Sequence, residues 1–355
     1  MTDRPALATT GELAAALGAD LAGPPDLPIS GIETLGGAGR GDLAFIRSAK
    51  FASEWSGSKA SAALVTRGIE VPGHDPTARA LLMVDDADRA MLELLKVAQA
   101  RLAPPRPAPG VHPTAIVGED AEIAPSASIG PYAVIGAGAA IGEQVLVGAH
   151  AFIDEGVRVG DGTTLHPRVT LLRGTAVGRG CEFFPGVVIG GDGFGFLPGP
   201  QGPLKVPHVG GVRIGDQVEV GSCTSIDRGK FSDTVIGDAT KIDNQVQIGH
   251  ACKIGRGVII CGCCGIGGSV AIGDGAILGG HVAVADNIEI PAGSRVGGGS
   301  AVDQSVTADE PWFGWPARPV SVSMRAITAS WKLPQYRQTL RELKKRVDAL
   351  EGPTK

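Results

Sequence analysis

The chain has 355 residues, 43 % of them hydrophobic, and a formal net charge of −5 at pH 7, which fits a globular protein of two or three domains and gives no indication of nucleic-acid binding. No apolar run reaches membrane-spanning length and the N-terminus lacks a basic start followed by an apolar signal segment, so we expect a cytoplasmic protein without a transmembrane segment. With 54 glycines but only 2 tyrosines and 9 phenylalanines, its core is predicted to consist of small aliphatic side chains, and its six cysteines to be reduced thiols.

Residues 1–102 are predicted to form a small α/β domain. The segments GELAAALGADL and DADRAMLELLKVAQARL have helical patterns, whereas LAFI, SAALVT and ALLMV are short strand candidates. The proline-rich segment APPRPAPGVHP, residues 103–113, is typical of a stiff linker.

A six-residue repeat dominates residues 114–306. Every sixth residue is apolar from Val117 to Ile189, from Ile214 to Ile226 and, after a skip of four residues, from Ile236 to Val302. Three such hexads complete one triangular coil of 18 residues, and coils stack by parallel strand pairing with the apolar residues inside. The repeat predicts a mainly β protein built on a parallel β-helix, and its resemblance to the hexapeptide-repeat class implies a left-handed one.

Two insertions interrupt the repeat. The glycine- and proline-rich stretch GGDGFGFLPGPQGPLKVPHVGGVR separates Ile189 from Ile214, and a shorter insertion within RGKFSD follows Asp227. The longer one is predicted to leave the prism as a loop. Such loops on a rigid solenoid favour ligand binding, although a loop that only covers the prism wall or a neighbouring chain is the alternative.

Residues 307–355 are predicted to be largely helical. Leu340, Leu343, Val347 and Leu350 follow one another at alternating spacings of three and four, a stripe that requires a partner. Between residues 321 and 347, seven basic side chains accompany a single acid, Glu342. This excess indicates either a solvated helix face or a docking surface for an acidic protein.

Metal and thiol chemistry are both disfavoured by the spacing of the histidines and cysteines. His150 and His281 share one hexad position but lie far apart along the stack, and no close histidine pair suggests zinc ligation. Cys181, Cys252 and Cys264 each stand two residues before an apolar anchor. Small buried filler is therefore favoured over a redox or metal cluster that would include CGCC.

His250, in KIDNQVQIGHACKIG, is the strongest catalytic candidate. It stands at a corner two residues after Ile248, and a neutral imidazole there could accept a proton at physiological pH. Gly268 follows 18 residues later, so it is expected one coil away, about 4.8 Å along the stack. A glycine N–H can approach an oxyanion closely, which makes the pair a candidate acyl-transfer site. The alternative is a solvated corner histidine.

Four segments together resemble one enzyme family. They are LGGAGRGDLAFIRSAKF near the N-terminus, VIGGDGFGF (188–196), IGDQVEVGSCTSIDRG (214–229) and KIDNQVQIGH. They are similar to the UDP-3-O-(3-hydroxyacyl)glucosamine N-acyltransferases of lipid A biosynthesis. The resemblance implies transfer of a 3-hydroxyacyl chain from acyl carrier protein to the 2-amino group of a UDP-glucosamine-type acceptor. It also implies a homotrimer with sites between subunits, and no metal or other cofactor beyond the acyl-phosphopantetheine of the carrier protein.

The resemblance also assigns roles to residues of the repeat region. His250 corresponds to the general base and Gly268 to the glycine whose N–H holds the oxyanion. Polar residues that surround the base and bind substrate correspond to Asp243, Asn244 and Gln247. A second, assisting histidine of some members aligns with Asn287, so this chain departs from them there.

The flanking regions receive roles from the same resemblance. Residues 1–102 correspond to a uridine-binding domain, in which Phe45 contacts the uracil and Phe51 replaces a frequent tyrosine on the same ring. Ser48 stands where asparagine is common, so its hydrogen bond to uracil is a departure from the pattern. The C-terminal helices of residues 307–355 correspond to the docking region for acyl carrier protein.

Other functions remain open at this point. An O-acyltransferase acting on UDP-N-acetylglucosamine would share the hexads, the carrier protein and the histidine, but typically lacks a domain like residues 1–102. A coenzyme A-dependent sugar acetyltransferase, a catalytically silent trimeric scaffold and a nucleotide-sugar binding module are further alternatives.

Overall fold

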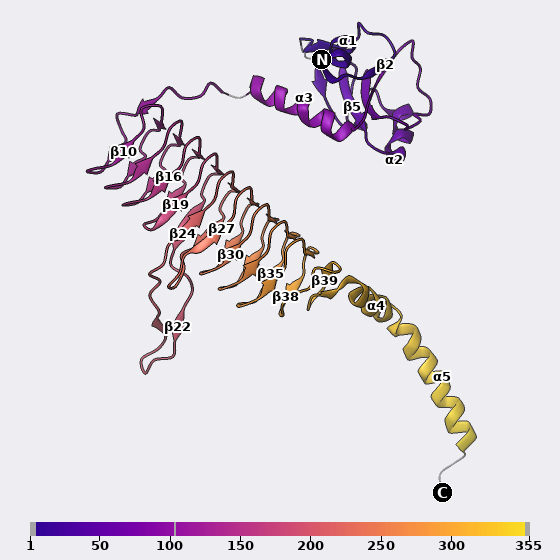
Figure 1. The fold of residues 1–355 in the computed structure, drawn as a ribbon. Helices are drawn as coiled ribbons and strands as arrows, with labels where there is room; N and C mark the ends of the chain where they lie inside the picture. Colours follow the sequence, from indigo (N-terminus) through magenta and orange to yellow (C-terminus); the bar gives the residue numbers. More distant parts are fainter. Residues whose placement is uncertain (1–4, 103, 352–355) are drawn as a thin grey trace. The chain divides into compact units, whose positions relative to one another are not determined.

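The computed structural model describes residues 5–102 and 104–351 (Figure 1). Contacts divide the chain into two compact units at the bond between Arg106 and Pro107. Residue 103, where the predicted linker begins, and the chain ends 1–4 and 352–355 lie outside the described residues. The proposed boundaries at residues 102, 113 and 306 stay predictions.

The N-terminal unit is a small α/β domain, as predicted. Within residues 5–102 its main sheet has five strands, parallel except for the first, in the order β2 (Asp20–Ala22), β7 (Ala80–Val84), β6 (Ala62–Thr66), β5 (Asp42–Ile46) and β4 (Gly31–Ile32). A smaller pair and the helices complete it: β1 (Ala8–Thr9), β3 (Pro28–Ile29), α1 (Thr10–Leu17), α2 (Ala49–Ala52), the 3₁₀ helix η1 (Ser53–Gly57) and α3 (Ala87–Leu102). Successive residues of β5 and β6 enter different apolar clusters, so both faces of the sheet are buried.

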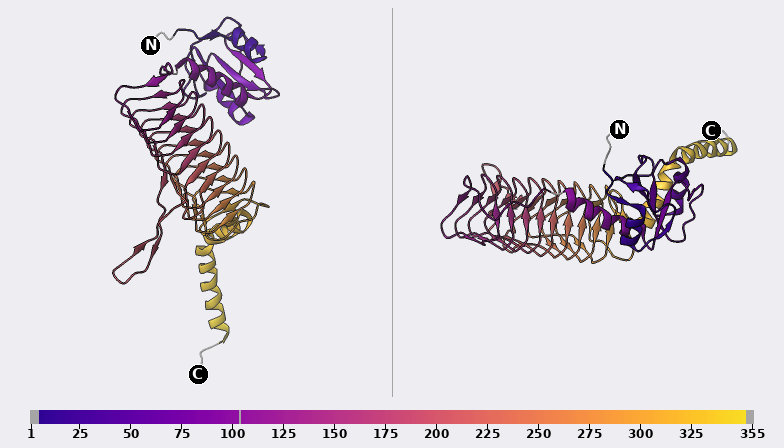
Figure 2. Two further views of the ribbon diagram at one scale, coloured as in Figure 1. Left: turned by 60° about the vertical axis from the view of Figure 1, so that its left-hand side comes forward. Right: turned by 90° about the horizontal axis from the view of Figure 1, so that it is seen from above.

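The second unit is a parallel β-helix, which confirms the fold predicted from the repeat (Figure 2). Within residues 104–351 most strands are two residues long, and every third strand joins the same sheet.

The largest sheet of the prism consists of β8 (Gly110–Val111), β11 (Ser128–Ile129), β14 (Leu146–Val147), β17 (Thr164–Leu165), β20 (Glu182–Phe183), β25 (Glu219–Val220), β28 (Lys241–Ile242), β31 (Ile259–Ile260), β34 (Ile277–Leu278), β37 (Arg295–Val296), β39 (Trp312–Phe313) and β40 (Arg318–Pro319). The second consists of β9 (Ile116–Val117), β12 (Val134–Ile135), β15 (Phe152–Ile153), β18 (Thr170–Leu171), β21 (Val188–Gly191), β26 (Ser225–Asp227), β29 (Gln247–Ile248), β32 (Gly265–Ile266), β35 (Ala283–Val284) and β38 (Ala301–Val302). The third consists of β10 (Glu122–Ile123), β13 (Ala140–Ile141), β16 (Arg158–Val159), β19 (Thr175–Val177), β24 (Val212–Ile214), β27 (Thr234–Ile236), β30 (Lys253–Ile254), β33 (Ala271–Ile272) and β36 (Glu289–Ile290).

The apolar residue of each hexad points into the prism. Ile248, for example, is fully buried and pairs with Ile226 on one side and Ile266 on the other. The prediction was wrong for the first two core positions, because Val117 is 43 % exposed and Ile123 is half-buried. Both belong to strands at the sheet edges, where a coil stacks against them on one side only.

The two insertions lie where the repeat breaks. Thr175 pairs with Val212 across the long insertion, and Val212 pairs with Thr234 across the short one. The long insertion carries an antiparallel hairpin of β22 (Phe196–Leu197) and β23 (Leu204–Lys205), which leaves the wall of coils in Figure 1. The prism therefore continues on both sides of the insertions, with one irregularity of register between Ile189 and Gly191, where β21 pairs with β26.

The C-terminal segment ends in two helices, α4 (Val320–Trp331) and α5 (Leu333–Glu351), as the stripe predicted. The stripe residues of α5 are exposed in the described chain, for instance Leu340 at 65 % and Val347 at 46 %. Among residues 5–102 and 104–351, no helix combines the length and apolar character required to cross a bilayer.

Candidate active site

His250 lies at the corner after β29, on the wall of a cavity of about 580 Å³. Its carbonyl accepts a hydrogen bond from Ser269 N–H at 2.8 Å, which ties the corner to the next coil. The cavity is formed by neighbouring coils and by the long insertion, and its lining includes Asp192, Gly193, Asp227, Gln247, Gly268 and Asp286. Its volume is typical of small-molecule sites.

Gly268 lies directly against the His250 ring, as the 18-residue coil predicted. A Cβ at this position would come within 2.6 Å of both Nε2 and Cε1 of His250. Any larger residue would therefore push the imidazole away. Gly268 thus places the Nε2 edge of the ring against a backbone without a side chain.

The N–H of Gly268 is already engaged. It donates to Oδ1 of Asp286 at 2.6 Å. The same bond recurs at other corners, where Glu143 N–H donates to Asp161 and Arg256 N–H donates to Asp274, each at 2.8 Å. The contact is thus part of the corner repeat, and an oxyanion at Gly268 would have to compete with Asp286. Asp286 was not predicted from the sequence, although it stands one coil after Gly268 and the 18-residue spacing indicates it.

Partial burial is the largest influence on His250 and lowers the pKa of its imidazole below the ordinary 6.5. The neighbouring His208 and Lys230 lower this pKa further, whereas Asp286 and Asp227 oppose the shift. His250 is consequently neutral at pH 7, the form that can accept a proton.

His208, from the long insertion, is an aromatic neighbour of His250 that was not predicted from the sequence. Its side chain is 5 % exposed, and its ring centroid lies 5.0 Å from that of His250 with an interplanar angle of 60°. A Cβ at Gly193 would come within 2.7 Å of both His208 Nε2 and His250 Cβ. Gly193, the middle glycine of the GDGFG segment, therefore leaves room for the two rings. No periodic signal could have revealed this contact, because the insertion lies outside the repeat.

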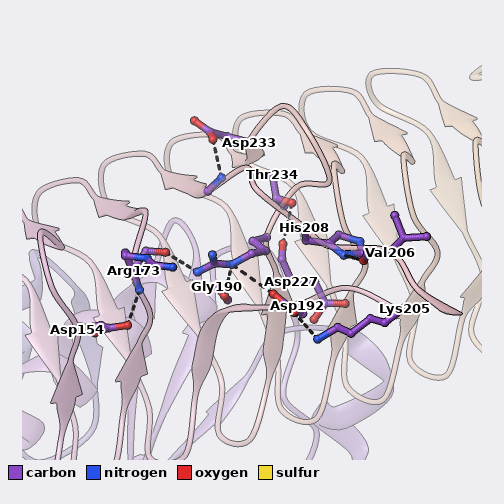
Figure 3. A network of polar contacts seen from close by, with 12 residues as sticks. Asp154, Arg173, Gly190, Asp192, Lys205, Val206, His208, Asp227, Asp233 and Thr234 are labelled. Carbon is purple, nitrogen blue, oxygen red and sulfur yellow. Dashed lines mark hydrogen bonds and ion pairs between the residues drawn. The ribbon is translucent and has the colours of Figure 1, made fainter. Parts of the chain in front are cut away.

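Arg228 anchors the long insertion to the prism through the network of Figure 3. Its side chain is 13 % exposed, its Nε donates to Gly190 O at 2.7 Å, and its guanidinium also donates to Arg173 O. Asp192 in turn pairs with Lys205, and this contact is the main reason that the Asp192 pKa is lowered. The TSIDRG and GGDGFGF segments are therefore bonded to each other at the edge of the cavity.

The other polar residues suggested by the resemblance do not all meet at His250. Gln247 lines the cavity, whereas Asp243 and Asn244 lie at the corner after β28. There Asp243 accepts from Gly262 N–H at 2.8 Å and Asn244 Oδ1 accepts from Ser222 N–H at 2.7 Å. Asn287 is exposed, and its N–H donates to Gly268 O at 2.9 Å.

The N-terminal unit has a separate cavity of about 400 Å³ that brings Phe45 and Phe51 together. Arg47 Cζ lies 5.3 Å and Lys50 Nζ 6.0 Å from the centroid of the Phe51 ring, so two cationic side chains lie close to this ring. Ser48 immediately precedes α2, and its side chain makes no capping hydrogen bond. The aromatic pair is an appropriate surface for a planar base.

Metal ligands do not cluster in the part of the chain that the structure describes: no group of three or more His, Cys, Asp or Glu side chains could hold an ion. Cys181, Cys252 and Cys264 are buried in the prism, as expected for small filler residues. Burial raises the pKa of Cys252 and of Cys264 to about 11, which leaves little reactive thiolate at pH 7.

Comparisons with known sequences indicate one family. A family model described as LpxD, UDP-3-O-(3-hydroxymyristoyl) glucosamine N-acyltransferase, matches residues 26–97, and a model described as bacterial transferase hexapeptide (six repeats) matches residues 233–268. The chain is 43 % identical over 343 residues to the UDP-3-O-acylglucosamine N-acyltransferase of Pseudomonas aeruginosa, a match that covers 96 % of this chain and 95 % of the relative. It is 47 % identical over 341 residues to the enzyme of the same name from Nitrosococcus oceani, covering 96 % and 97 %. Among solved structures, the UDP-N-acetylglucosamine O-acyltransferase of Moraxella catarrhalis is 27 % identical and aligns over 59 % of this chain and 73 % of that one, with a TM-score of 0.48.

Proposed function

Because the chain belongs to the UDP-3-O-acylglucosamine N-acyltransferase family of lipid A biosynthesis, we propose that it transfers a 3-hydroxyacyl chain from acyl carrier protein to the 2-amino group of UDP-3-O-(3-hydroxyacyl)-glucosamine. The observation that carries this proposal is the neutral His250 in a cavity, with its Nε2 edge against the backbone of Gly268.

His250 is the general base of the proposed reaction. The acceptor amine attacks the thioester carbonyl, a C–N bond forms, and His250 Nε2 takes the proton that the nitrogen loses. The tetrahedral intermediate then collapses, the C–S bond breaks, and the carrier thiolate leaves with the proton that the His250 imidazolium returns. The Gly268 N–H stabilises the oxyanion of this intermediate. To do so it must release its hydrogen bond to Asp286 and donate to the negative oxygen instead.

The remaining parts of the chain bind the two substrates in this proposal. Residues 1–102 bind uridine through Phe45 and Phe51, with Ser48 nearby, and residues 103–113 link this domain to the catalytic prism of residues 114–306. The basic helices of residues 307–355 dock the acidic carrier protein. The chain acts as a homotrimer with sites between subunits. Asp243 and Asn244 of one subunit bind substrate at a site whose His250 belongs to another subunit.

A single-turnover assay tests the function directly. The full-length protein is mixed with 3-hydroxyacyl carrier protein and either UDP-3-O-(3-hydroxyacyl)-glucosamine or UDP-N-acetylglucosamine, and products are identified by mass spectrometry. Acylation of the free amine is expected. Acylation of a hydroxyl on UDP-N-acetylglucosamine, or binding without turnover, would replace the proposal by the O-acyltransferase or the scaffold.

Phe45→Ala is expected to raise the KM for the nucleotide sugar by about tenfold while kcat stays near the wild-type value, because stacking on the base is lost but no reacting group changes. Steady-state kinetics at saturating acyl carrier protein measures this. Leu92→Ala, an exposed apolar residue of α3 in the same unit, is the control. An unchanged KM in Phe45→Ala would contradict the uracil contact.

The pH dependence of kcat/KM is expected to follow the titration of His250 and to shift when Asp286 is replaced. Since neutral His250 is the active form and its pKa is lowered, kcat/KM rises with pH and levels off, with a midpoint below 6.5. The Asp286 carboxylate raises this pKa, so Asp286→Asn moves the midpoint to lower pH. Asparagine keeps the corner bond, as Asn244 does with Ser222 at 2.7 Å.

Asp274→Asn is the matched control for this profile, because Asp274 makes the equivalent corner bond to Arg256 N–H and does not line the His250 cavity. Its midpoint is expected to equal that of the wild type. A midpoint that moves upward in Asp286→Asn, or equally in both variants, would rule out the direct influence of Asp286 on the base.

A further inference from the structure

His208 offers the His250 ring a hydrogen-bond acceptor that the proposed mechanism does not yet use. We propose that His208 is a positioning residue, whose Nε2 accepts a hydrogen bond from Nδ1–H of His250 and thereby keeps Nε2 of His250 free to take the proton of the amine. This inference rests on the proposed function, and it adds a residue of the long insertion to the acyl-transfer site.

The state of His208 follows from its backbone contact. Its Nδ1 lies 3.0 Å from the carbonyl oxygen of Val206. A carbonyl oxygen only accepts hydrogen bonds, so Nδ1 carries the proton in this contact. In neutral His208 the other nitrogen, Nε2, is then an acceptor. That atom is buried, and it has no hydrogen-bond partner within the described part of the chain.

His250 has the complementary requirement. Its Nε2 faces Gly268 and must be unprotonated to act as a base, so Nδ1 carries the proton of the neutral ring. Nδ1 of His250 is also buried and is without a hydrogen-bond partner among residues 5–102 and 104–351. A buried donor and a buried acceptor on neighbouring rings therefore each lack what the other supplies, and burial makes an unsatisfied polar atom unfavourable.

The surroundings favour His208 over the carboxylates as this acceptor. Asp286 is bonded to Gly268 N–H, which lies beside the opposite, Nε2 edge of the ring. The Asp227 carboxylate is likewise not a hydrogen-bond partner of Nδ1, which has none among the described residues. Lys230, the remaining charged neighbour that acts on His250, has no acceptor atom.

His250 Nδ1 and His208 Nε2 are not bonded to each other in the described structure, so the pairing requires an adjustment of the two rings. The two ring centroids are 5.0 Å apart, and Gly193 leaves both rings unobstructed. Catalytic hydrogen bonds are commonly loose in free enzymes and tighten when substrate binds. When His250 becomes an imidazolium, its Nδ1–H becomes a stronger donor, so the bond to His208 stabilises the charged form. His208 thus performs the orienting task that an aspartate performs in a catalytic triad.

The experiment compares His208→Phe, which removes the acceptor, with His208→Gln, whose Oε1 retains one. For each full-length protein, kcat and both KM values are measured, and the His250 ring is titrated by NMR of protein labelled with ¹³Cε1-histidine. We expect His208→Phe to lower kcat by up to about a hundredfold with KM values unchanged, the order of loss that follows from misplacing a catalytic group, and His208→Gln to retain most of the activity.

The direction in which the His250 pKa changes distinguishes a hydrogen bond to His208 from repulsion by it. If His208 accepts from His250, the hydrogen bond stabilises the imidazolium by more than the like-charge repulsion by which His208 lowers the His250 pKa. The His250 pKa is then lower in His208→Phe but near the wild-type value in His208→Gln. A His250 pKa that rises in both variants would show that His208 acts through like charge and would overturn the inference. Equal loss of activity in the two variants would do the same, because it would indicate packing alone.

The failure of this inference differs from failure of the proposed function. A wild-type protein that transfers no acyl chain would contradict the function, yet the NMR titration would still show whether the two rings are paired. Normal turnover in His208→Phe, alongside an inactive His250→Ala, would leave the function intact and remove His208 from it.

Discussion

His250→Ala is expected to lower kcat by about 10²- to 10⁴-fold, the usual contribution of a positioned general base. The ring lines the cavity and contributes nothing to the apolar interior of the prism, which the neighbouring Ile248 fills. The fold, the assembly of subunits and the binding of both substrates are consequently expected to stay intact, and the loss falls on kcat rather than on KM.

Single-turnover acylation, circular dichroism and a nucleotide-sugar binding assay measure these quantities for His250→Ala. His281→Ala is the matched control, because His281 is an exposed corner histidine of the same prism and does not line the His250 cavity. It is expected to turn over like the wild type. Near-normal turnover in His250→Ala would remove this residue from the role of base.

Gly268→Ala is expected to lower kcat by about 10²-fold, the order of loss that follows from misplacing a catalytic group. The added Cβ would lie 2.6 Å from Nε2 and Cε1 of His250, so the imidazole must move away from the reacting nitrogen. The backbone of Gly268 does not have a positive φ, and alanine is therefore tolerated locally. The thermal unfolding midpoint should change little compared with the activity.

Gly265→Ala is the control for this substitution, because a Cβ at Gly265 meets no heavy atom within 4 Å. Both variants are compared in single-turnover rate and in the NMR titration of His250, which would report a displaced ring. Since alanine retains the backbone N–H, the pair of variants tests the close approach of Gly268 to His250. Wild-type turnover in Gly268→Ala would show that this approach is not needed.

The repeat made much of the fold predictable. One coil takes 18 residues, so a position in the sequence translates directly into a position along the stack, and Ile248 pairs with Ile266 as the period requires. The same translation placed Gly268 against His250 and would have placed Asp286 beside Gly268. It also overestimated the core at the first coil, where Val117 remains exposed because coils stack on one side only.

The sequence alone thus determined the β-helix, its register and the approach of Gly268 to His250, because these follow from a fixed period. The tertiary structure decided what surrounds the base. Asp243 and Asn244 are close to His250 in sequence but lie at a different corner, since each hexad turns the chain. His208 reaches His250 through an insertion that has no period, held by bonds to backbone carbonyls that no sequence pattern encodes.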